Sequence, residues 1–283
     1  MCMIPGTVFS ERKYACKMAG PQVPLEIAAG VYCLEVGKGI TAANIYFVQS
    51  GSGWVLIDTG TTGCAPAIQA AADRLFEPDA RPVAILLTHD HPDHAGSALP
   101  LARSWAVDVL VHPDEMPIVL GDMAAFKRFA NPLDRWLILP LMQMMGPERA
   151  QATTARASFK EVARRLDRGE SPPGLPDWRV ILTPGHTPGH VAFFRLRDRV
   201  LIAGDALLTV DVNSPLGLLT RRQKVSGPPW YVTWDRALAK RSLAALARLE
   251  PHVLGGGHGV PMTGPETAAR VRDLAGRVAT ARG

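Results

Sequence analysis

The stretch THDHPDHAG, which starts at position 88, places three histidines and two aspartates in six consecutive positions. Imidazole nitrogens and carboxylate oxygens are good ligands for zinc and, with less preference, for iron and manganese. Pro92 lacks a backbone donor and favours an extended conformation at His91, so the stretch cannot form one regular helix. In an extended segment His89 and His91 point to the same side, whereas Asp93 and His94 lie beyond the proline. We therefore expect these two pairs to face two different metal ions.

Polar residues of the same kinds follow apolar runs later in the chain. They are His186 and His190 in TPGHTPGH, Asp205 in AGD and His258 in GGGHG. Short β-branched or leucine-rich runs that end in a polar residue and a turn are typical of buried strands, and here they span 53–60, 83–91, 178–186, 199–205 and 251–259. Because open sheets place their sites at the carboxyl edge of the strands, we expect these side chains to meet there.

The segments between these runs predict the fold class. Alanine, leucine and arginine recur at helical spacing in four segments, at about 64–76, 95–104, 235–249 and 265–281. GVYCLEV, ANIYFVQ and GWVLID are typical of consecutive hairpin strands, so we expect an α/β protein with more than one sheet. No segment resembles a linker, and residues 1–283 are expected to form one domain.

Residues 113–176 interrupt this pattern. They contain apolar helical stretches rich in methionine and phenylalanine, then a polar helix and the proline-rich turn SPPGLP. Adaptable methionine side chains suit variable apolar ligands, so one interpretation of this helical insertion is a lid over a substrate pocket lined by Phe126, Phe129 and Trp136. An extra core layer or a homodimer surface is an equally good interpretation of the same pattern.

Composition argues against several classes of protein. The net charge is +5 and the pI is near 9.2, but lysine and arginine are spread out apart from RRQK at 221–224, so we expect no nucleic-acid partner. The longest near-apolar stretch, WLILPLMQMMG, is too short for a bilayer, and the first ten residues lack the features of a signal peptide. We therefore expect no membrane association and a cytoplasmic location. The four cysteines match no zinc pattern and are expected to be free thiols.

The chain resembles the metallo-β-lactamase superfamily from about position 30 to position 264. The HxHxDH motif of that family is matched residue for residue by His89, His91, Asp93 and His94. The resemblance implies a four-layered αβ/βα sandwich, with the site at the edge between two sheets. It also implies a first metal on His89, His91 and His186, a second metal on Asp93, His94 and His258, and Asp205 as a bridge between the two.

The resemblance extends to residues that support the ligands. Asp58 of IDTG matches an early aspartate of the family, which is expected to brace the metal loop by hydrogen bonds rather than bind metal, and Thr88 is expected to act likewise. His190 is expected to play a packing or supporting role, because the metal coordination is already supplied. His112 and His252 are expected to be partly exposed and to have no chemical role.

The implied chemistry is hydrolysis at a site with two divalent ions per chain. Zinc is the expected metal, with iron or manganese as alternatives. Metal lowers the pKa of bound water to about 7, so hydroxide held between the ions could attack a carbonyl without a Ser, Cys or Lys nucleophile. Asp93 would orient that hydroxide and pass a proton toward the leaving group. The expected substrate is a small molecule, anionic or acylated, with an ester, lactone or thioester bond.

Comparison with branches of the family narrows the choice of substrate. β-Lactamases put a cysteine at a metal position or lack the bridging aspartate, whereas this chain has Asp205 and no cysteine beyond position 64. Glyoxalase II thioesterases carry a C-terminal helical domain, and here the sequence ends soon after His258. Acyl-homoserine lactonases usually have a tyrosine close after the bridging aspartate, for which Tyr231 could substitute only if its loop folds back.

Two other activities are compatible with the same motif. A mononuclear iron dioxygenase of persulfides would be recognised by its iron content and by oxygen uptake. A phosphodiesterase or nuclease is suggested by the pI and by RRQK, and would be recognised by salt-dependent binding of DNA or RNA. A binding protein without catalytic activity is disfavoured, because every expected ligand position is filled.

Overall fold

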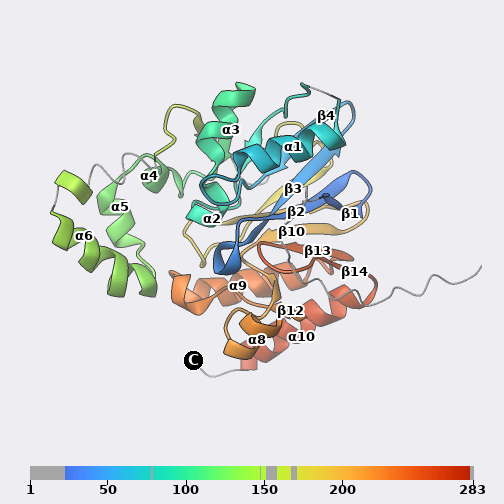
Figure 1. Ribbon diagram of the computed structural model, residues 1–283. Helices are drawn as coiled ribbons and strands as arrows, with labels where there is room; N and C mark the ends of the chain where they lie inside the picture. The colour runs from blue at the N-terminus through green and yellow to red at the C-terminus, as the bar shows by residue number, and fades with distance from the viewer. Residues whose placement is uncertain (1–22, 78, 147, 151–157, 167–170, 281–283) are drawn as a thin grey trace, which may run out of the picture.

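The computed structural model describes residues 23–77, 79–146, 148–150, 158–166 and 171–280. In this part of the chain two β-sheets face each other, and each sheet carries helices on its outer side (Figure 1). The order of layers is helix, sheet, sheet, helix. The expected α/β class and the four-layered αβ/βα sandwich are therefore confirmed.

The first sheet takes its strands in chain order, from β1 to β7. The first four strands form an antiparallel meander, and the last three add in parallel. The strands are β1 (Leu25–Ala28), β2 (Val31–Val36), β3 (Ala43–Ser50), β4 (Gly53–Ile57), β5 (Ile85–Leu86), β6 (Val109–Val111) and β7 (Ala163–Arg165). The three predicted hairpin strands are β2, β3 and β4.

The second sheet has the strand order β14-β13-β10-β9-β8. Only β10 and β13 pair in parallel in this sheet as described, and the other neighbours are antiparallel. The strands are β8 (Trp178–Leu182), β9 (Val191–Arg195), β10 (Val200–Gly204), β13 (Val253–Gly256) and β14 (Met262–Thr263). A separate antiparallel pair, β11 (Leu208–Val210) and β12 (Gln223–Ser226), flanks helix α8 (Pro215–Thr220) in the sequence.

Alternation along the strands sorts the side chains into layers. In β4, Trp54 and Leu56 belong to the cluster under the outer helices, whereas Val55 and Ile57 belong to the cluster between the sheets. Successive side chains of a strand point to opposite faces, and here both faces are covered. This arrangement explains why the central strands are apolar at nearly every position.

Four helices cover the outer faces, close to the four segments where helical spacing predicts them. Helices α1 (Ala65–Leu75) and α3 (Ala98–Trp105) pack on the first sheet, and α9 (Arg236–Ala247) and α10 (Glu266–Thr280) pack on the second (Figure 1). The carboxylate of Asp235 caps α9 by accepting two backbone N–H groups of its first turn. The N–H of Asp235 also donates to the carbonyl of Gly185 at 2.9 Å, which joins α9 to the loop after β8.

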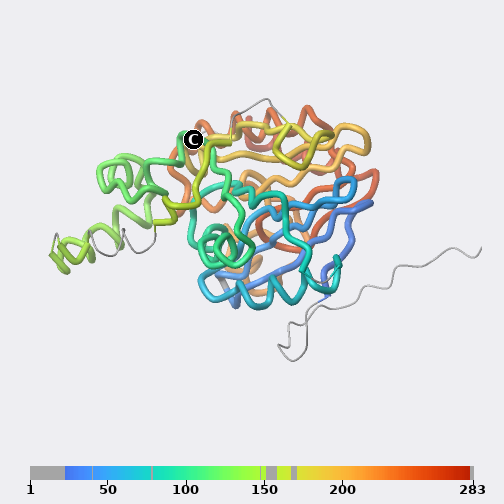
Figure 2. Tube along the Cα trace, turned by 90° about the horizontal axis from the view of Figure 1, so that it is seen from above, coloured from blue at the N-terminus to red at the C-terminus, as the bar shows by residue number. Residues whose placement is uncertain are grey.

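A helical lobe projects from one side of the sandwich (Figures 1 and 2). It contains α4 (Met116–Val119), α5 (Met123–Arg128), the π-helical turn η2 (Asp134–Ile138) and α6 (Leu139–Met145). No residue of η2 or α6 is buried, and Trp136 and Met144 are each 84% exposed. Helices η2 and α6 therefore do not form an extra core layer, whereas Val119 of α4 is buried in the cluster under the outer helices.

Two further features of the 113–176 region bear on its role. It is not helical throughout, because β7 lies within it and completes the first sheet, with Ala163 opposite Val109. The exposed apolar face of η2 and α6 is typical of an interaction surface, so the lid and the homodimer surface both stay predictions. Within the described residues, no helix has the length and apolar character needed to cross a bilayer.

The buried layers predict a large difference between two leucines that both lie in strands. Leu56→Ala in β4 removes a fully buried side chain and should lower the free energy of unfolding by about 2–5 kcal/mol. Leu25→Ala in edge strand β1, where the leucine is half exposed, should lower it by about 1 kcal/mol or less. Urea denaturation of the metal-free protein measures both, and equal losses would contradict this layer assignment.

Candidate metal centre

The predicted ligands lie on loops that follow four strands of the two sheets. Helix α2 (Pro92–Ala95) begins directly after His91, so the first of these loops passes into a single helical turn. The loop after β5 carries His89 and His91 and leads into α2, which carries Asp93 and His94. The loops after β8, β10 and β13 carry His186, Asp205 and His258, respectively. His89 and His258, which are 169 positions apart in the sequence, thus meet at the carboxyl edges of the strands.

These side chains form three groups in which the potential ligand atoms lie within 4.8 Å of one another. The first group is His89, His91 and His186, the second is His89, His94 and Asp205, and the third is Asp93, His94 and His258. The first and third groups have no residue in common. The second group shares His89 with the first group and His94 with the third. The arrangement therefore offers two separate sets of three donors and one carboxylate beside both.

Asp205 occupies the central position. Its Oδ1 lies 3.4 Å from Nε2 of His94, and its Oδ2 lies 3.3 Å from Nε2 of His186 and 3.4 Å from Nε2 of His258. The side chain is almost fully buried. Oδ1 thus faces the third group, and Oδ2 faces both the first and the third group. A ligand shared by two metal ions needs this placement.

Asp58 holds the loop that carries the HxHxDH motif. Its Oδ1 accepts the backbone N–H of Thr88 at 2.8 Å, and its Oδ2 accepts the Thr88 hydroxyl at 2.8 Å and Nδ1 of His94 at 2.9 Å. Since the Thr88 hydroxyl donates to Asp58, it accepts from Nδ1 of His89, 3.0 Å away. Asp58 has φ of 61°, a conformation uncommon for residues other than glycine, and local strain of this kind clusters at functional sites.

The rings of His186 and His258 are also oriented by an acceptor for the hydrogen on Nδ1. Nδ1 of His186 lies 3.3 Å from the hydroxyl of Thr233, which itself donates to the carbonyl of Pro229 and therefore accepts from the ring. Nδ1 of His258 donates to the carbonyl of Ala42 at 2.7 Å. With the hydrogen on Nδ1, the Nε2 atom of each ring presents a lone pair to the centre.

Four potential ligand atoms take no part in these hydrogen bonds, although they are buried. They are Nε2 of His89, His94 and His186 and Oδ1 of Asp205. A buried polar atom without a partner costs about 1–3 kcal/mol, so four of them at one point need an explanation. A divalent cation would satisfy them, and a set of imidazole nitrogens and carboxylate oxygens fits zinc, iron or manganese. The residues present therefore fit a metal centre.

Burial and the carboxylates act on the histidines in opposite directions. Burial lowers the pKa of His89 and of His186 well below the ordinary value, and neighbouring imidazoles act in the same sense. Burial also opposes protonation of His94 and His258, but nearby carboxylates, with Asp205 foremost, outweigh it and raise both pKa values. In the metal-free protein the protons are therefore held at His94 and His258.

His190 supports the centre from behind. Its Nε2 accepts the backbone N–H of Asp205 at 3.0 Å, so the ring hydrogen lies on Nδ1, which contacts the hydroxyl of Thr183 at 2.7 Å. Burial lowers the pKa of His190 to about 3, which keeps the ring neutral and able to accept. His190 therefore fixes the backbone that presents the central carboxylate.

The lobe reaches the metal centre through an aromatic contact. The ring of Phe129 meets the ring of Trp234 edge-on at 5.2 Å, and the N–H of Trp234 donates to the carbonyl of His186 at 3.1 Å. Phe126 and Phe129 are partly buried. Trp136, the third residue expected to line the pocket, is 84% exposed, and its place in a pocket stays a prediction.

Tyr231 lies on the short helix η3 (Trp230–Val232), two residues before Thr233. Burial raises the pKa of its hydroxyl, and so do the charges of Asp205 and Asp93. The segment of Tyr231 is joined to the loop of His186, because Thr233 contacts Nδ1 of His186 at 3.3 Å and the N–H of Trp234 donates to the His186 carbonyl at 3.1 Å.

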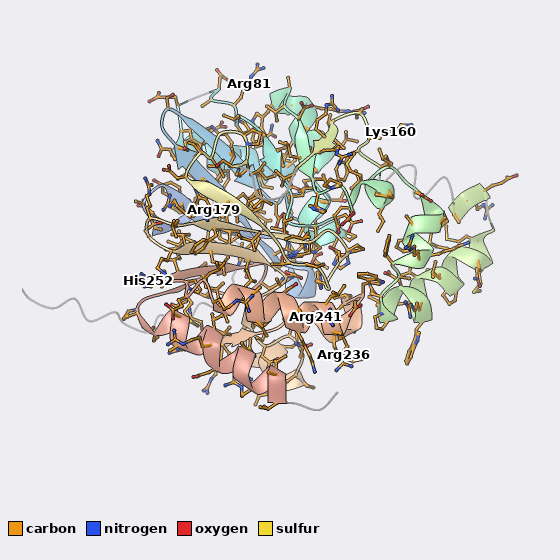
Figure 3. All side chains as sticks on the ribbon, turned by 180° about the vertical axis from the view of Figure 1, so that it is seen from behind. Arg81, Lys160, Arg179, Arg236, Arg241 and His252 are labelled. Atoms are coloured by element: carbon orange, nitrogen blue, oxygen red, sulfur yellow. The ribbon has the colours of Figure 1, made fainter. Side chains whose placement is uncertain are left out.

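The two remaining histidines differ from each other. His252 is exposed, as expected, and lies far from the lobe in Figure 3. His112 was expected to be partly exposed, but it is only 6% exposed, and its Nδ1 accepts the N–H of Asp114 at 3.2 Å. The reason is that the chain turns inward after β6, and there His112 lies beside the backbone of Gly189.

Sequence reasoning missed several residues that hold the metal loops. Asn44 donates to the carbonyls of Gly256 and Gly259 at 2.9 and 2.7 Å, and the hydroxyl of Tyr46 donates to Gly256 at 2.6 Å. A buried asparagine inside an otherwise apolar strand was the available signal for the first of these. Glu115 gave no such signal, although it contacts two metal loops.

The raised pKa values predict that metal binding releases protons. Because the pKa values of His94 and His258 are raised, zinc has to displace protons from these rings up to a higher pH than at an ordinary histidine. Apparent zinc affinity should therefore rise with pH, and the proton release should disappear once the pH exceeds the raised pKa values. Calorimetric titration in two buffers of different ionisation enthalpy measures this release. Binding that is independent of pH between about 5 and 8 would contradict the assignment.

Known proteins share both the sequence and the fold of this chain. A curated relative, "Probable metallo-hydrolase YflN" of Bacillus subtilis, is 35% identical over 271 residues, which is 93% of this chain and 100% of the relative. The crystal structure of a metallo-beta-lactamase family protein, TTHA1429 from Thermus thermophilus, matches with a TM-score of 0.61 at 26% identity and covers 89% of this chain and 80% of that one. AidC, described as a dizinc quorum-quenching lactonase, matches with a TM-score of 0.54 at 19% identity, over 77% of this chain and 72% of its own.

The family model of the metallo-beta-lactamase superfamily matches residues 39–258. This range runs from the turn before β3 to His258, and thus includes strands β3 to β13 and all seven predicted metal ligands. On the motif, the layered fold and this match, the chain belongs to the metallo-β-lactamase superfamily.

Proposed function

We propose that this protein is a dinuclear, zinc-dependent hydrolase that cleaves an ester, lactone or thioester. The observation that carries the proposal is the pair of three-residue groups on either side of Asp205, with four buried atoms that no hydrogen bond satisfies. The naming of a curated relative as a metallo-hydrolase supports the reaction class. The first ion would be held by His89, His91 and His186, the second by Asp93, His94 and His258, and Asp205 would be shared.

The chain's own residues supply binding and proton transfer around those ions. When bound, two divalent ions would lower the pKa of a water molecule and polarise a substrate carbonyl. The side chain of Asp93 is 25% exposed, whereas that of Asp205 is 3% exposed, so Asp93 is the carboxylate that a substrate can reach. We assign Asp93 the role of accepting a proton from the attacking water and returning it to the leaving group.

A covalent mechanism through cysteine is disfavoured by the surroundings of the two described thiols. Burial raises the pKa of Cys33 to about 12, so this thiol stays protonated and unreactive at neutral pH. Cys64 is buried near the start of α1. Neither cysteine belongs to the groups that surround Asp205.

The choice of bond rests on the shape of the entrance. Phe129 and Trp234 place apolar rings beside the loop of His186, and Tyr231 lies in the segment that Thr233 and Trp234 join to this loop. Apolar walls with a few polar groups suit an acylated small molecule. The fold likeness to a dizinc lactonase is consistent with a lactone or related ester among the substrates.

The nuclease alternative has less support. Figure 3 labels five surface cations, and Arg81, Lys160 and Arg179 lie in different parts of the molecule, away from the pair Arg236 and Arg241 on α9. Nucleic-acid binding proteins concentrate such residues in a stripe along one face. The five labelled cations, out of 31 lysines and arginines in the chain, form no such stripe.

The test of the proposed function combines metal analysis with a substrate panel. The purified protein should contain about two zinc ions per chain and hydrolyse at least one member of a lactone, thioester and aryl-ester panel. Asp205→Asn should lower the metal content and reduce kcat by a factor of about 100 or more, because both groups lose charge. Iron with oxygen uptake, or activity on phosphodiesters alone, would overturn the proposal. Asp73→Asn on the exposed face of α1 serves as the control.

The lobe predicts a contrast between two aromatic residues. Phe129→Ala should raise KM for substrates with long acyl chains about tenfold more than for acetyl substrates, since it removes the ring that contacts Trp234. Trp136→Ala should change neither KM, because its side chain is 84% exposed. Steady-state kinetics on an acyl-length series measures both. A larger effect of Trp136→Ala would show that the exposed face of the lobe, rather than its inner face, binds substrate.

A further inference from the structure

Glu115 is a fully buried acid outside the metal-ligand groups, at the N-terminal end of α4. Its Oε2 accepts the backbone N–H of Asp90 at 3.0 Å, and its Oε1 accepts the backbone N–H of Gly189 at 2.6 Å. Asp90 lies between His89 and His91 in the loop after β5. Gly189 belongs to the loop after β8 that carries His186. One carboxylate therefore joins two loops that are about 100 positions apart in the sequence.

We propose that Glu115 is a positioning residue that sets the distance between His186 and the pair His89 and His91, and so tunes the affinity of the first metal position. This inference rests on the proposed metal centre. The first group is the only one among the described ligand groups that combines histidines from both of these loops. The third group, of Asp93, His94 and His258, contains no residue of the loop after β8.

The packing around Gly189 shows how tightly this contact is built. A Cβ atom at Gly189 would lie 2.9 Å from Cγ of Glu115 and 2.8 Å from Nδ1 of His112, which is closer than real Cβ atoms approach. The loop can therefore donate its N–H to Glu115 only because position 189 has no side chain. On the strand side the same two segments are joined by the N–H of Val191, which donates to the carbonyl of Thr88 at 2.9 Å. Glu115 makes the corresponding contact on the loop side.

The charge of Glu115 supports the same role. Within the described part of the chain no lysine or arginine forms a salt bridge with it, and the backbone N–H groups of Asp90 and Gly189 donate to its two oxygens. The nearby carboxyl of Asp90 adds no positive charge, and burial and then the charge of Glu115 raise the pKa of Asp90. A buried carboxylate needs compensation beyond two such bonds. Cations held by the adjacent histidines would provide it, so metal binding and the burial of Glu115 would stabilise each other.

The test uses two variants that break the same contact from opposite sides. Glu115→Gln keeps the size of the side chain but replaces one acceptor oxygen with an NH2 group that faces an N–H donor. Gly189→Ala adds the Cβ that pushes the loop away. Ser242→Ala is the control, because Ser242 donates to the carbonyl of Pro184 in the same loop without joining it to the loop after β5. Each protein is titrated with Zn²⁺ in competition with a chromophoric chelator and is also loaded with Co²⁺ for absorption spectra.

Both variants should weaken one of the two ions by about 10- to 100-fold, leave the other within about threefold, and change the ligand-field bands of Co²⁺. The control should bind both ions as the unaltered protein does. Unchanged affinities and spectra in Glu115→Gln, or an equal loss at both positions together with a lower melting temperature of the metal-free protein, would overturn the inference. If Glu115→Gln fails to fold, Gly189→Ala decides alone. Selective metal loss without hydrolysis of any ester, lactone or thioester would sink the proposed function and leave this inference standing.

Discussion

A neutral histidine presents a lone pair at Nε2 when its hydrogen is on Nδ1, and an acceptor for that hydrogen fixes both the tautomer and the direction of the ring. Much of this fold serves to provide those acceptors. The acceptor for His94 is Asp58 at the end of β4, and that for His258 is the carbonyl of Ala42 just before β3. The acceptor for His186 is Thr233, just before α9. These groups come from both halves of the sandwich. The direction of each imidazole is therefore set by the packing of the two sheets, not by the loop that carries it.

The sequence predicted what depends on local spacing. The histidines and aspartates of THDHPDHAG, the strands that precede the metal loops and the four outer helices all have a periodic or short-range signature. Contacts such as Asn44 with Gly256 join residues 212 positions apart, and no local pattern announces such a pairing. Strand β7 has three residues, too few for any periodicity to show. The exposure of residues 134–145 was also hidden, because their segment is apolar on nearly every side and gives no buried face to recognise.

The centre is supported unevenly. On one side, the loop of His186 is pressed against α9, where a Cβ at Gly185 would lie 2.1 Å from the backbone nitrogen of Ala239. On the other side, Asp93 and Tyr231 remain partly exposed, and the ring of Phe129 in the lobe contacts Trp234. Close-packed backbone resists displacement, whereas exposed side chains adapt. Substrate preference can therefore change at the entrance without altering the geometry of the metal ligands.

The ligands are distributed along the chain in a way that bears on biosynthesis. His89, His91, Asp93 and His94 are made first, His186 and Asp205 follow, and His258 comes only after β13. A nascent or truncated chain that stops before β13 has the donors of the first group but lacks part of the third. It also lacks the glycine carbonyls through which Asn44 and Tyr46 join the two sheets. Full metal occupancy thus reports that translation and the docking of the two halves are both complete.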